Sequence, residues 1–385
     1  MLNWSTACPD WESRIVNQQS LITFPPLFPK EAKAAMSVFD DLIVADVVGK
    51  PPMRDVCRPW FRDFASTIFG AYDADDGRRL INEFFLLVSK KNFKSGGAAG
   101  LVVTALVRNW RESAEVHVLA PTKEIADNAF KPARDMISND PELQTLLHVQ
   151  EHTRTITHLT TGAILKVIAA DNETVGGKKA SVILVDELWL FGKRARAEDM
   201  FREATGGLAA RPEGFVIYLT TQSDEPPAGV FKSKLQYARD VRDGVIVDPK
   251  FLPVLYEFPE QYLKRKLYLL PENFYITNPN LGASVDPEYL EREKRKAEAN
   301  AESLRGFLSK HLNVEIGLAL RSDRWAGVDF WEQNAATFVL SLEELIKRSE
   351  VVCVGVDGGG LDDMLGFAAL GREPNIGRTV ADIQR

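Results

Sequence analysis

The chain has 385 residues, enough for two or more domains, and its 45% hydrophobic and 26% charged residues are ordinary for a globular protein. Its formal net charge of −7 excludes a protein that coats nucleic acid with its whole surface, so any contact with DNA must be local. The three scattered cysteines match neither a disulfide nor a zinc pattern, and no apolar run has membrane-spanning length, so we expect a cytoplasmic protein without membrane contact.

The first part of the chain predicts helices separated by prolines. Residues 32–48 and 60–69 carry apolar side chains at helical spacing, whereas residues 73–78 are polar and include a glycine, which is typical of a loop. We therefore expect a helical segment before the first strand.

From residue 84 onward, apolar runs alternate with helical patterns. Continuous apolar runs predict strands that are buried on both faces, and the residues between them predict helices. The predicted strands are residues 84–88, 116–120, 164–169, 182–185 and 215–219, and the predicted helices are residues 96–107 and 123–137. Strands that alternate with helices build βαβ units. The predicted fold class is therefore α/β, with a mainly parallel sheet flanked by helices.

The composition changes after residue 223. Prolines recur up to residue 287, and residues 287–308 then predict one charged amphipathic helix. A further helix is predicted at residues 341–349, followed by strands at residues 351–356 and 365–370. This change indicates that separate regions follow the predicted sheet.

A basic loop connects the first predicted strand to its helix and has the position of a P-loop. Backbone N–H groups of such a loop bind the phosphates of ATP, while Lys94 would reach the β and γ oxygens and Ser95 would bind Mg²⁺. The candidate nucleotide-binding residues are Lys90, Lys91, Asn92, Phe93, Lys94, Ser95 and Gly96. Val88 and Phe93 stand where the usual pattern has glycine. Taken alone, the loop is also compatible with a basic surface turn.

Two later strands end in polar residues that a hydrolytic site requires. Asp186 and Glu187 follow the most β-branched strand, where Asp186 would hold Mg²⁺ and Glu187 would polarise the attacking water. Thr220 and Thr221 end the next strand, where they would sense the γ-phosphate. The alternatives are solvated acids that cap a helix and an ordinary polar strand exit. The order of the three motifs favours a P-loop ATPase core, with Lys94, Glu187, Thr220 and Thr221 as its catalytic residues.

From about residue 59 to residue 370 the chain resembles the large terminase subunit of tailed bacteriophages, the DNA-packaging motor. The loop from Lys90 to Ser95 is similar to that family's Arg-Lys-Asn-Gly-Lys-Ser loop, and the segment around Trp60 resembles its adenine site, with Phe61 where a glutamine is usual. Residues 278–282 look like the family's Asn-Pro-x-Leu-Gly turn, and residues 307–313 look like its Phe-x-x-x-x-Leu-Asn segment. We give these last two segments structural roles only.

The resemblance implies three regions. Residues 1–240 would form the ATPase domain, with its core at about 80–225, and residues 241–345 would form a helical lid or linker. Residues 346–385 would begin an RNase H-like nuclease, in which Asp357 and Asp363 would hold two divalent metal ions. The remaining nuclease acids would lie beyond residue 385. We therefore expect the natural protein to be longer and this chain not to cut DNA.

The resemblance also implies a function and partners. The chain would be an ATP- and Mg²⁺-dependent motor that translocates double-stranded DNA, gripped by its phosphates, into the procapsid. It would bind the portal protein and a small terminase subunit as a homo-oligomeric ring. It would act in the cytoplasm of an infected or lysogenic bacterial host, docked transiently on the procapsid. Alternatives are a helicase-like nucleic-acid ATPase and a nucleotide-binding scaffold without turnover. Candidates for a catalytic cation are Arg194, Arg196, Arg202 and Arg211, with Lys90 as a candidate within the same subunit.

Overall fold

The computed structural model describes residues 26–169, 180–194, 197–317, 340–357, 366–372, 374 and 379–384. It divides into two compact units, Met1–Arg324 and Trp325–Arg385. Unit 1 contains, in chain order, α2 (Pro29–Asp41), α3 (Met53–Val56), α4 (Pro59–Phe69), β1 (Tyr72–Asp73), β2 (Arg78–Arg79), β3 (Glu83–Leu87), α5 (Lys94–Val107), β4 (Glu115–Ala120), α6 (Lys123–Ser138), α7 (Pro141–Leu146), β5 (Leu147–Gln150), β6 (Thr155–His158), β7 (Ile164–Ala169), β8 (Ala180–Val185), η1 (Leu188–Lys193), α8 (Ala197–Gly206), η2 (Gly207–Ala210), β9 (Phe215–Thr220), α9 (Gly229–Arg242), β10 (Phe251–Leu255), α10 (Glu260–Lys264), η3 (Leu267–Leu269), η4 (Pro271–Ile276), α11 (Pro287–Ala297) and α12 (Ala301–Leu312).

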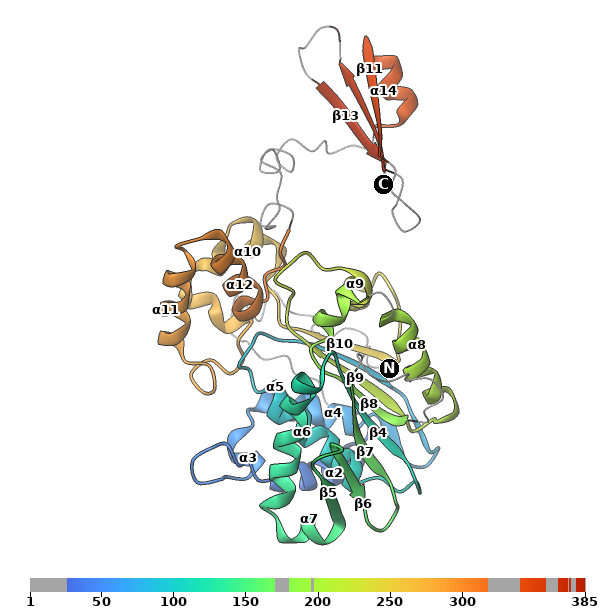
Figure 1. Ribbon diagram of the computed structural model, residues 1–385, viewed down its shortest axis with the longest axis vertical. Coiled ribbons are helices and arrows are strands. Elements are labelled where there is room, and N and C mark those ends of the chain that lie inside the picture. The colour runs from blue at the N-terminus through green and yellow to red at the C-terminus, as the bar shows by residue number, and fades with distance from the viewer. Residues whose placement is uncertain are drawn as a thin grey trace. The chain divides into compact units, whose positions relative to one another are not determined.

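An eight-stranded sheet organises unit 1 (Figure 1). Its strands follow the order β10-β3-β9-β8-β4-β7-β6-β5. The strands from β10 to β7 are parallel, and β6 and β5 add an antiparallel edge. The prediction of an α/β fold with a mainly parallel sheet is therefore confirmed. The strands β5, β6 and β10 were not predicted.

Alternation along the strands divides the apolar side chains between two cores. In β3, Phe84 and Leu86 join a core with α2, α4, α5 and α6, whereas Phe85 and Leu87 join a core with η1, α8 and α9. Successive side chains of a strand point to opposite faces, so one strand contributes to both cores. The helices on the two faces exclude water from the sheet, which is why its parallel strands are mostly apolar (Figure 1).

Two predicted helices have different bounds in the structure. The helix predicted at residues 32–48 ends at Asp41, because Val44 and Met53 donate backbone hydrogen bonds to Pro51 and Leu42 across a turn at Gly49. The single helix predicted at residues 287–308 is two helices, α11 and α12. The break is at Asn300, whose side chain accepts a hydrogen bond from the backbone N–H of Ser303 at 2.7 Å. Both errors arise where local polar geometry ends a helix that apolar spacing alone would continue.

The strand β10 lies inside residues 241–345, the range that the sequence assigned to the lid. It pairs with β3 as an edge strand of the main sheet. Pro253 sits opposite Phe85 in this pair, and an edge strand tolerates proline because one of its sides needs no N–H donor. Residues 258–316, called the helical segment below, follow β10 and have their own core around Phe274, Phe307 and Leu312.

Unit 2 contains α14 (Leu342–Arg348), β11 (Val351–Asp357), β12 (Gly366–Arg372) and β13 (Thr379–Gln384). The three strands form an antiparallel sheet, and α14 begins with a capping box at Ser341 and Glu344. Asp357 is the last residue of β11, and Asp363 lies outside the described residues. Among the described residues of the whole chain, no helix combines the length and apolar character needed to cross a bilayer.

Candidate active site

The strand order brings the three predicted motifs to one edge of the sheet. The strand β9 lies between β3 and β8, and all three are parallel. The phosphate loop, residues 88–95, follows β3, Asp186 and Glu187 follow β8, and Thr220 ends β9. The carboxyl ends of neighbouring parallel strands form the usual ligand site of such sheets.

The phosphate loop turns sharply before α5. Lys91 and Phe93 have φ angles of 69° and 61°, in the left-handed region that favours glycine. Lys94 then begins α5, and its side chain is 7% exposed. The Nζ atom of Lys94 lies 3.6 Å from Oε1 of Glu187 and donates to the carbonyl oxygen of Val88 at 3.4 Å. The structure therefore brings Lys94 and Glu187 together, while Ser95 occupies the second position of α5.

The two acidic residues differ in charge environment. Burial and the neighbouring Glu187 raise the pKa of Asp186 to about 7, although Lys94 opposes that shift. Burial also tends to raise the pKa of Glu187, but Lys94, the indole N–H of Trp189 and Lys310 together hold it below its ordinary value. Glu187 is therefore the ionised partner near neutral pH, as a group that polarises water must be.

The tip of β9 offers unused hydrogen-bonding groups next to the phosphate loop. Thr220 Oγ1 accepts a hydrogen bond from the backbone N–H of Trp189 at 3.1 Å and donates to the carbonyl oxygen of Thr221. By contrast, Ser89 Oγ, Thr221 Oγ1 and both polar atoms of the Gln222 side chain are buried without a hydrogen-bond partner. Such orphaned groups are costly unless a ligand or water completes them, so this edge fits a bound polar molecule such as a nucleotide phosphate.

Asn92 was predicted to bind nucleotide as part of the phosphate loop, and in the structure its side chain contacts the helical segment. Its Nδ2 donates to the carbonyl oxygens of Ser89 and Lys90 and to Oδ1 of Asn278 at 2.9 Å, and its Oδ1 accepts from the backbone N–H of Asn280 at 2.9 Å. The buried amide thus shapes the loop from behind.

Lys90 and Lys91 are both exposed on the phosphate loop. The backbone N–H of Lys90 donates to the carbonyl oxygen of Lys310 at 2.7 Å, and the carbonyl oxygen of Lys91 accepts from Ser284 Oγ. The helical segment therefore also contacts the loop through its backbone. Gly96 lies in the first turn of α5, where a Cβ would come 2.9 Å from the ring of Phe93.

Trp60, the predicted adenine-site residue, is 1% exposed. Its Nε1 donates to Oδ1 of Asn280 at 2.6 Å, and its ring packs edge-on against Tyr256. In this arrangement the ring of Trp60 supports the Asn280 turn and is not open to a base. The adjacent Phe61 is also fully buried, with its ring 6.1 Å from that of Phe93 in a T-shaped pair.

The candidate arginines lie in different places. Arg202 is exposed on α8 and pairs with Asp199 at 2.6 Å. Arg211 precedes the amino end of β9, and six residues of strand span about 20 Å, so it is remote from Glu187 within one chain. Arg194 directly follows η1, and Arg196 lies outside the described residues.

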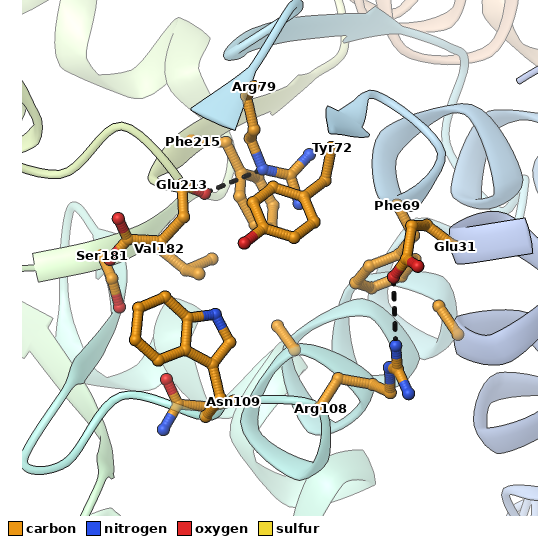
Figure 2. A pocket seen from close by; sticks show the side chains of 13 residues that line it. Glu31, Phe69, Tyr72, Arg79, Arg108, Asn109, Ser181, Val182, Glu213 and Phe215 are labelled. Carbon is orange, nitrogen blue, oxygen red and sulfur yellow. Dashed lines mark hydrogen bonds and ion pairs between the residues drawn. The ribbon is translucent and has the colours of Figure 1, made fainter. Parts of the chain in front are cut away.

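A separate cavity of about 170 Å³ lies at the opposite ends of the same strands (Figure 2). It is lined by Ser181 near the start of β8 and by Phe215, the first residue of β9. The guanidinium carbon of Arg79 lies 3.9 Å from the ring centroid of Phe215, and Nε of Arg79 donates to the carbonyl oxygen of Glu213. Because the three motifs lie at the carboxyl ends, this cavity is not part of the candidate site.

The sequence interpretation missed two side chains at the site, Trp189 and Lys310. Trp189 Nε1 donates to Oε2 of Glu187 at 2.6 Å, and Nζ of Lys310 lies 3.0 Å from the ring centroid of Trp189. Lys310 falls inside the segment 307–313, to which the sequence analysis gave a structural role only. The distinctive sequence of residues 307–313 was therefore the signal that could have led to Lys310.

Comparisons with known proteins indicate a family for part of the chain. Residues 59–240 match the family described as "Terminase large subunit, ATPase domain". The chain is 24% identical over 272 residues to the terminase large subunit of Enterobacteria phage HK97, which covers 70% of this chain and 50% of that protein. The chain therefore spans about half the length of this curated relative.

Two solved structures are also similar to this chain. The crystal structure of the HK97 bacteriophage large terminase has a TM-score of 0.60 and 20% identity, and the match covers 91% of this chain and 67% of that chain. The large terminase of a thermophilic bacteriophage in complex with ATP-gamma-S has a TM-score of 0.37 and 11% identity, with coverage of 79% and 63%. Of these two likenesses, the one to the HK97 large terminase, with its TM-score of 0.60, supports a similar fold.

Proposed function

Residues 59–240 belong to the ATPase domain family of the terminase large subunit, and from this premise we propose that the chain is the ATP-hydrolysing motor that moves double-stranded DNA into a phage procapsid. The observation that supports the proposal is that Nζ of Lys94 lies 3.6 Å from Oε1 of Glu187 at the carboxyl ends of β3 and β8. A buried lysine that begins a helix and an ionised glutamate opposite it are two of the groups that a P-loop ATPase uses to hydrolyse ATP.

The residues of this edge have distinct roles in the proposed reaction. The loop N–H groups and Lys94 would bind the β- and γ-phosphates, and Ser95 and Asp186 would hold Mg²⁺. When bound, Mg²⁺ neutralises charge on the phosphate oxygens. Glu187 orients the attacking water and accepts its proton, for which its lowered pKa keeps it ionised at neutral pH.

Steady-state ATP hydrolysis by the wild type and by Lys94→Ala and Glu187→Gln tests the enzymatic part. We expect both variants to lose at least about a hundredfold in kcat, and Glu187→Gln to retain ATP binding. Lys33→Ala, which changes an exposed lysine of α2, is the matched control and should hydrolyse ATP like the wild type. Wild-type chain that binds ATP but turns it over no faster than both variants would refute the proposal and favour a scaffold without turnover.

The DNA part of the proposal needs its own assay. A packaging motor protects DNA inside a procapsid from added nuclease in an ATP-dependent way, together with the proposed portal protein and small terminase subunit. A helicase-like ATPase would instead separate the strands of a duplex. ATP-dependent strand separation without packaging would overturn the motor assignment while leaving the ATPase assignment intact. We propose that the motor works as a ring on the portal, in the cytoplasm of the bacterial host.

We also propose that unit 2 is part of an RNase H-like nuclease, with Asp357 and Asp363 as metal ligands. The support is the position of Asp357 as the last residue of β11 in an antiparallel sheet. A plasmid-cleavage assay with Mn²⁺ or Mg²⁺ tests this chain, for which we expect no cutting because further carboxylates are needed around two metals. Robust cutting that survives Asp357→Asn would contradict the role of Asp357.

A further inference from the structure

The helical segment reaches the catalytic edge through one buried cation. Lys310 lies in the last turn of α12 and is 8% exposed. Its Nζ donates to the carbonyl oxygen of Gln222 at 2.9 Å and lies 3.0 Å from the ring centroid of Trp189. An ammonium over an indole face is the strongest form of cation–π contact available to lysine, and burial strengthens it.

The indole of Trp189 joins this cation to the catalytic carboxylate. Its Nε1–H donates to Oε2 of Glu187 at 2.6 Å, while Oε1 of Glu187 faces Lys94. Glu187 has a φ of 52° at the junction between β8 and η1, so no regular helix or strand fixes the direction of its side chain. The orientation of the carboxylate therefore depends on the contacts made by Trp189 and Lys94.

We propose that Lys310 is a positioning residue for Glu187, which it holds through the ring of Trp189. The inference rests on the proposed role of Glu187 in ATP hydrolysis. It makes the rate of hydrolysis depend on the seating of α12 against the sheet, because a shift of α12 would withdraw the cation and release the indole. The helical segment would thus regulate the chemical step without contacting nucleotide.

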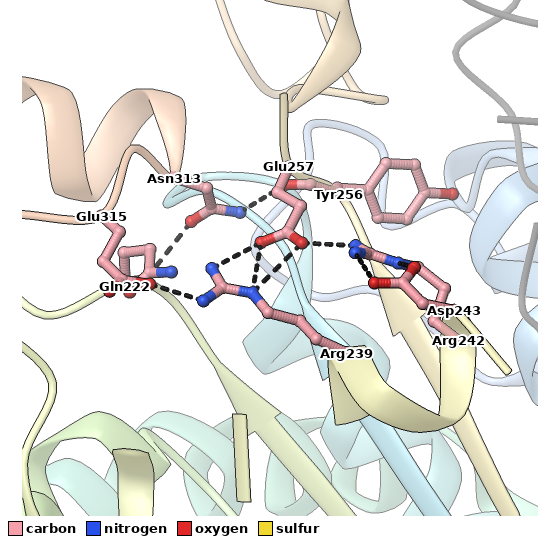
Figure 3. A network of polar contacts seen from close by, with 8 residues as sticks. All are labelled: Gln222, Arg239, Arg242, Asp243, Tyr256, Glu257, Asn313 and Glu315. Carbon is pink, nitrogen blue, oxygen red and sulfur yellow. Dashed lines mark hydrogen bonds and ion pairs between the residues drawn. The ribbon is translucent and has the colours of Figure 1, made fainter. Parts of the chain in front are cut away.

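The seating of α12 does not depend on Lys310 itself. Asn313, directly after α12, accepts from the backbone N–H of Gln222 at 3.3 Å and donates to the carbonyl oxygen of Tyr256 at 2.9 Å (Figure 3). Glu315 pairs with Arg239 of α9 at 2.6 Å (Figure 3). These contacts hold the end of α12 on the sheet when Lys310 is substituted, so a Lys310 variant tests the cation and not the docking of the helix.

The helical segment also contacts the phosphate loop through Asn278. Asn278 accepts from Asn92, and its own Nδ2 donates to the carbonyl oxygen of His311 at 2.8 Å. Asn278 therefore contacts both the loop that binds phosphates and α12, whereas the side chain of Lys310 acts on Glu187. Substitution at Asn278 should alter nucleotide affinity and also lower kcat where it shifts α12, whereas substitution at Lys310 should alter kcat alone.

The buried ammonium of Lys310 has two contacts that compensate for its loss of water. Burial lowers the pKa of this ammonium to about 7, against the opposing pull of Asp224 and Glu187. A methionine would fill the same space without the cost of desolvating a charge. The compensation visible in the structure is the contact with Trp189 and the hydrogen bond to Gln222.

The test compares Lys310→Met, Lys310→Arg and Trp189→Phe in the full chain, with ATP binding and steady-state hydrolysis measured separately. Lys310→Met should lower kcat roughly tenfold to a hundredfold and leave the Kd for ATP within about twofold, because misplacing a catalytic group slows chemistry without weakening binding. Lys310→Arg should recover most of the rate, since a guanidinium also stacks on an indole. Lys296→Met, which changes an exposed lysine of α11, is the control and should behave as wild type.

Trp189→Phe keeps a ring under Lys310 but lacks the N–H that contacts Glu187. It should slow hydrolysis as Lys310→Met does, and combining the two substitutions should add little further loss. Losses in kcat that multiply in the double variant, or a wild-type kcat in Lys310→Met, would overturn the inference. If Lys310→Met does not fold, a wild-type kcat in Trp189→Phe would overturn it. If Glu187→Gln hydrolyses ATP at the wild-type rate, the proposed function itself is wrong.

Discussion

The left-handed backbone at Phe93 allows a test that separates the cost of the backbone conformation from the contribution of the side chain. Phe93 is the N-cap of α5 at φ 61° and ψ 16°. A residue with a Cβ costs about 1–2 kcal/mol more than glycine in this region. Phe93→Ala removes the ring but keeps the Cβ, whereas Phe93→Gly removes both. The difference between the two variants therefore measures the backbone strain alone.

The contacts of the Phe93 ring determine how much folding free energy both variants lose. The half-buried ring forms a T-shaped pair with Phe61 and packs over Gly96. Half the burial of a phenylalanine contributes about 1 kcal/mol, and the aromatic pair adds about 0.5–1.5 kcal/mol. Phe93→Ala should thus cost about 1.5–2.5 kcal/mol of folding free energy, and Phe93→Gly about 1 kcal/mol less. The glycine variant should be the more stable, which reverses the order found inside helices.

Urea unfolding followed by far-ultraviolet circular dichroism measures both variants, compared at an unchanged m value. Ala34→Gly in the regular part of α2 is the control and should lose about 0.5–1 kcal/mol, the ordinary cost of glycine in a helix. If Phe93→Ala is as stable as Phe93→Gly or more stable, the backbone is not strained at this position and the reasoning is refuted.

Three further predictions concern packing, charge and capping. Gly97→Ala should cost about 1–3 kcal/mol of folding free energy in urea unfolding, because the new Cβ would lie 2.2 Å from Cζ of Phe61. Adding Phe61→Leu should recover part of this loss. A Gly97→Ala variant as stable as the wild type would contradict this packing. Glu257→Gln should cost about 3–5 kcal/mol, because two arginines of α9 lose their buried counter-charge. The arginines hold the pKa of Glu257 below its ordinary value, so its contribution is complete above that ordinary value and is lost as the pH falls through the lowered pKa; unfolding of Glu257→Gln should lack this acid dependence. Asn300→Ala should cost about 1 kcal/mol by urea unfolding, and no loss would show that the cap of α12 is dispensable.

The parallel strands at the centre of the sheet could be predicted because their buried residues form apolar runs in the sequence. All six residues of β8 are buried, and the last four, Val182 to Val185, form an apolar run rich in β-branched residues. The strands β5 and β6 are short and partly polar, so no such run marks them. The strand β10 contains Pro253, which argues against a strand unless the position is known to be a sheet edge. Edge positions are a property of the assembled sheet and not of the local sequence.

The difference between local sequence and assembled structure also explains which parts of the candidate site could be predicted. Lys94, Asp186, Glu187 and Thr220 each follow or end a strand, so chain order and parallel pairing alone bring them together. The partner of Asn92 is 186 residues away in the chain, and no local pattern indicates that its amide faces a turn of the helical segment. A motif can thus give the position of a residue without giving the direction of its side chain.

Phe61 and Phe93 are two of the departures from the resembled family's pattern, at positions where glutamine and glycine are usual. The sequence presents them as two unrelated defects of a nucleotide site. In the structure their rings pack against each other, and Gly97 leaves the space that Phe61 fills. Each ring is accommodated by the other, and the apolar contact offsets the strained backbone at Phe93. The two substitutions therefore act as one packing unit behind the phosphate loop, and Lys94 begins α5 directly after it with its Nζ facing Glu187.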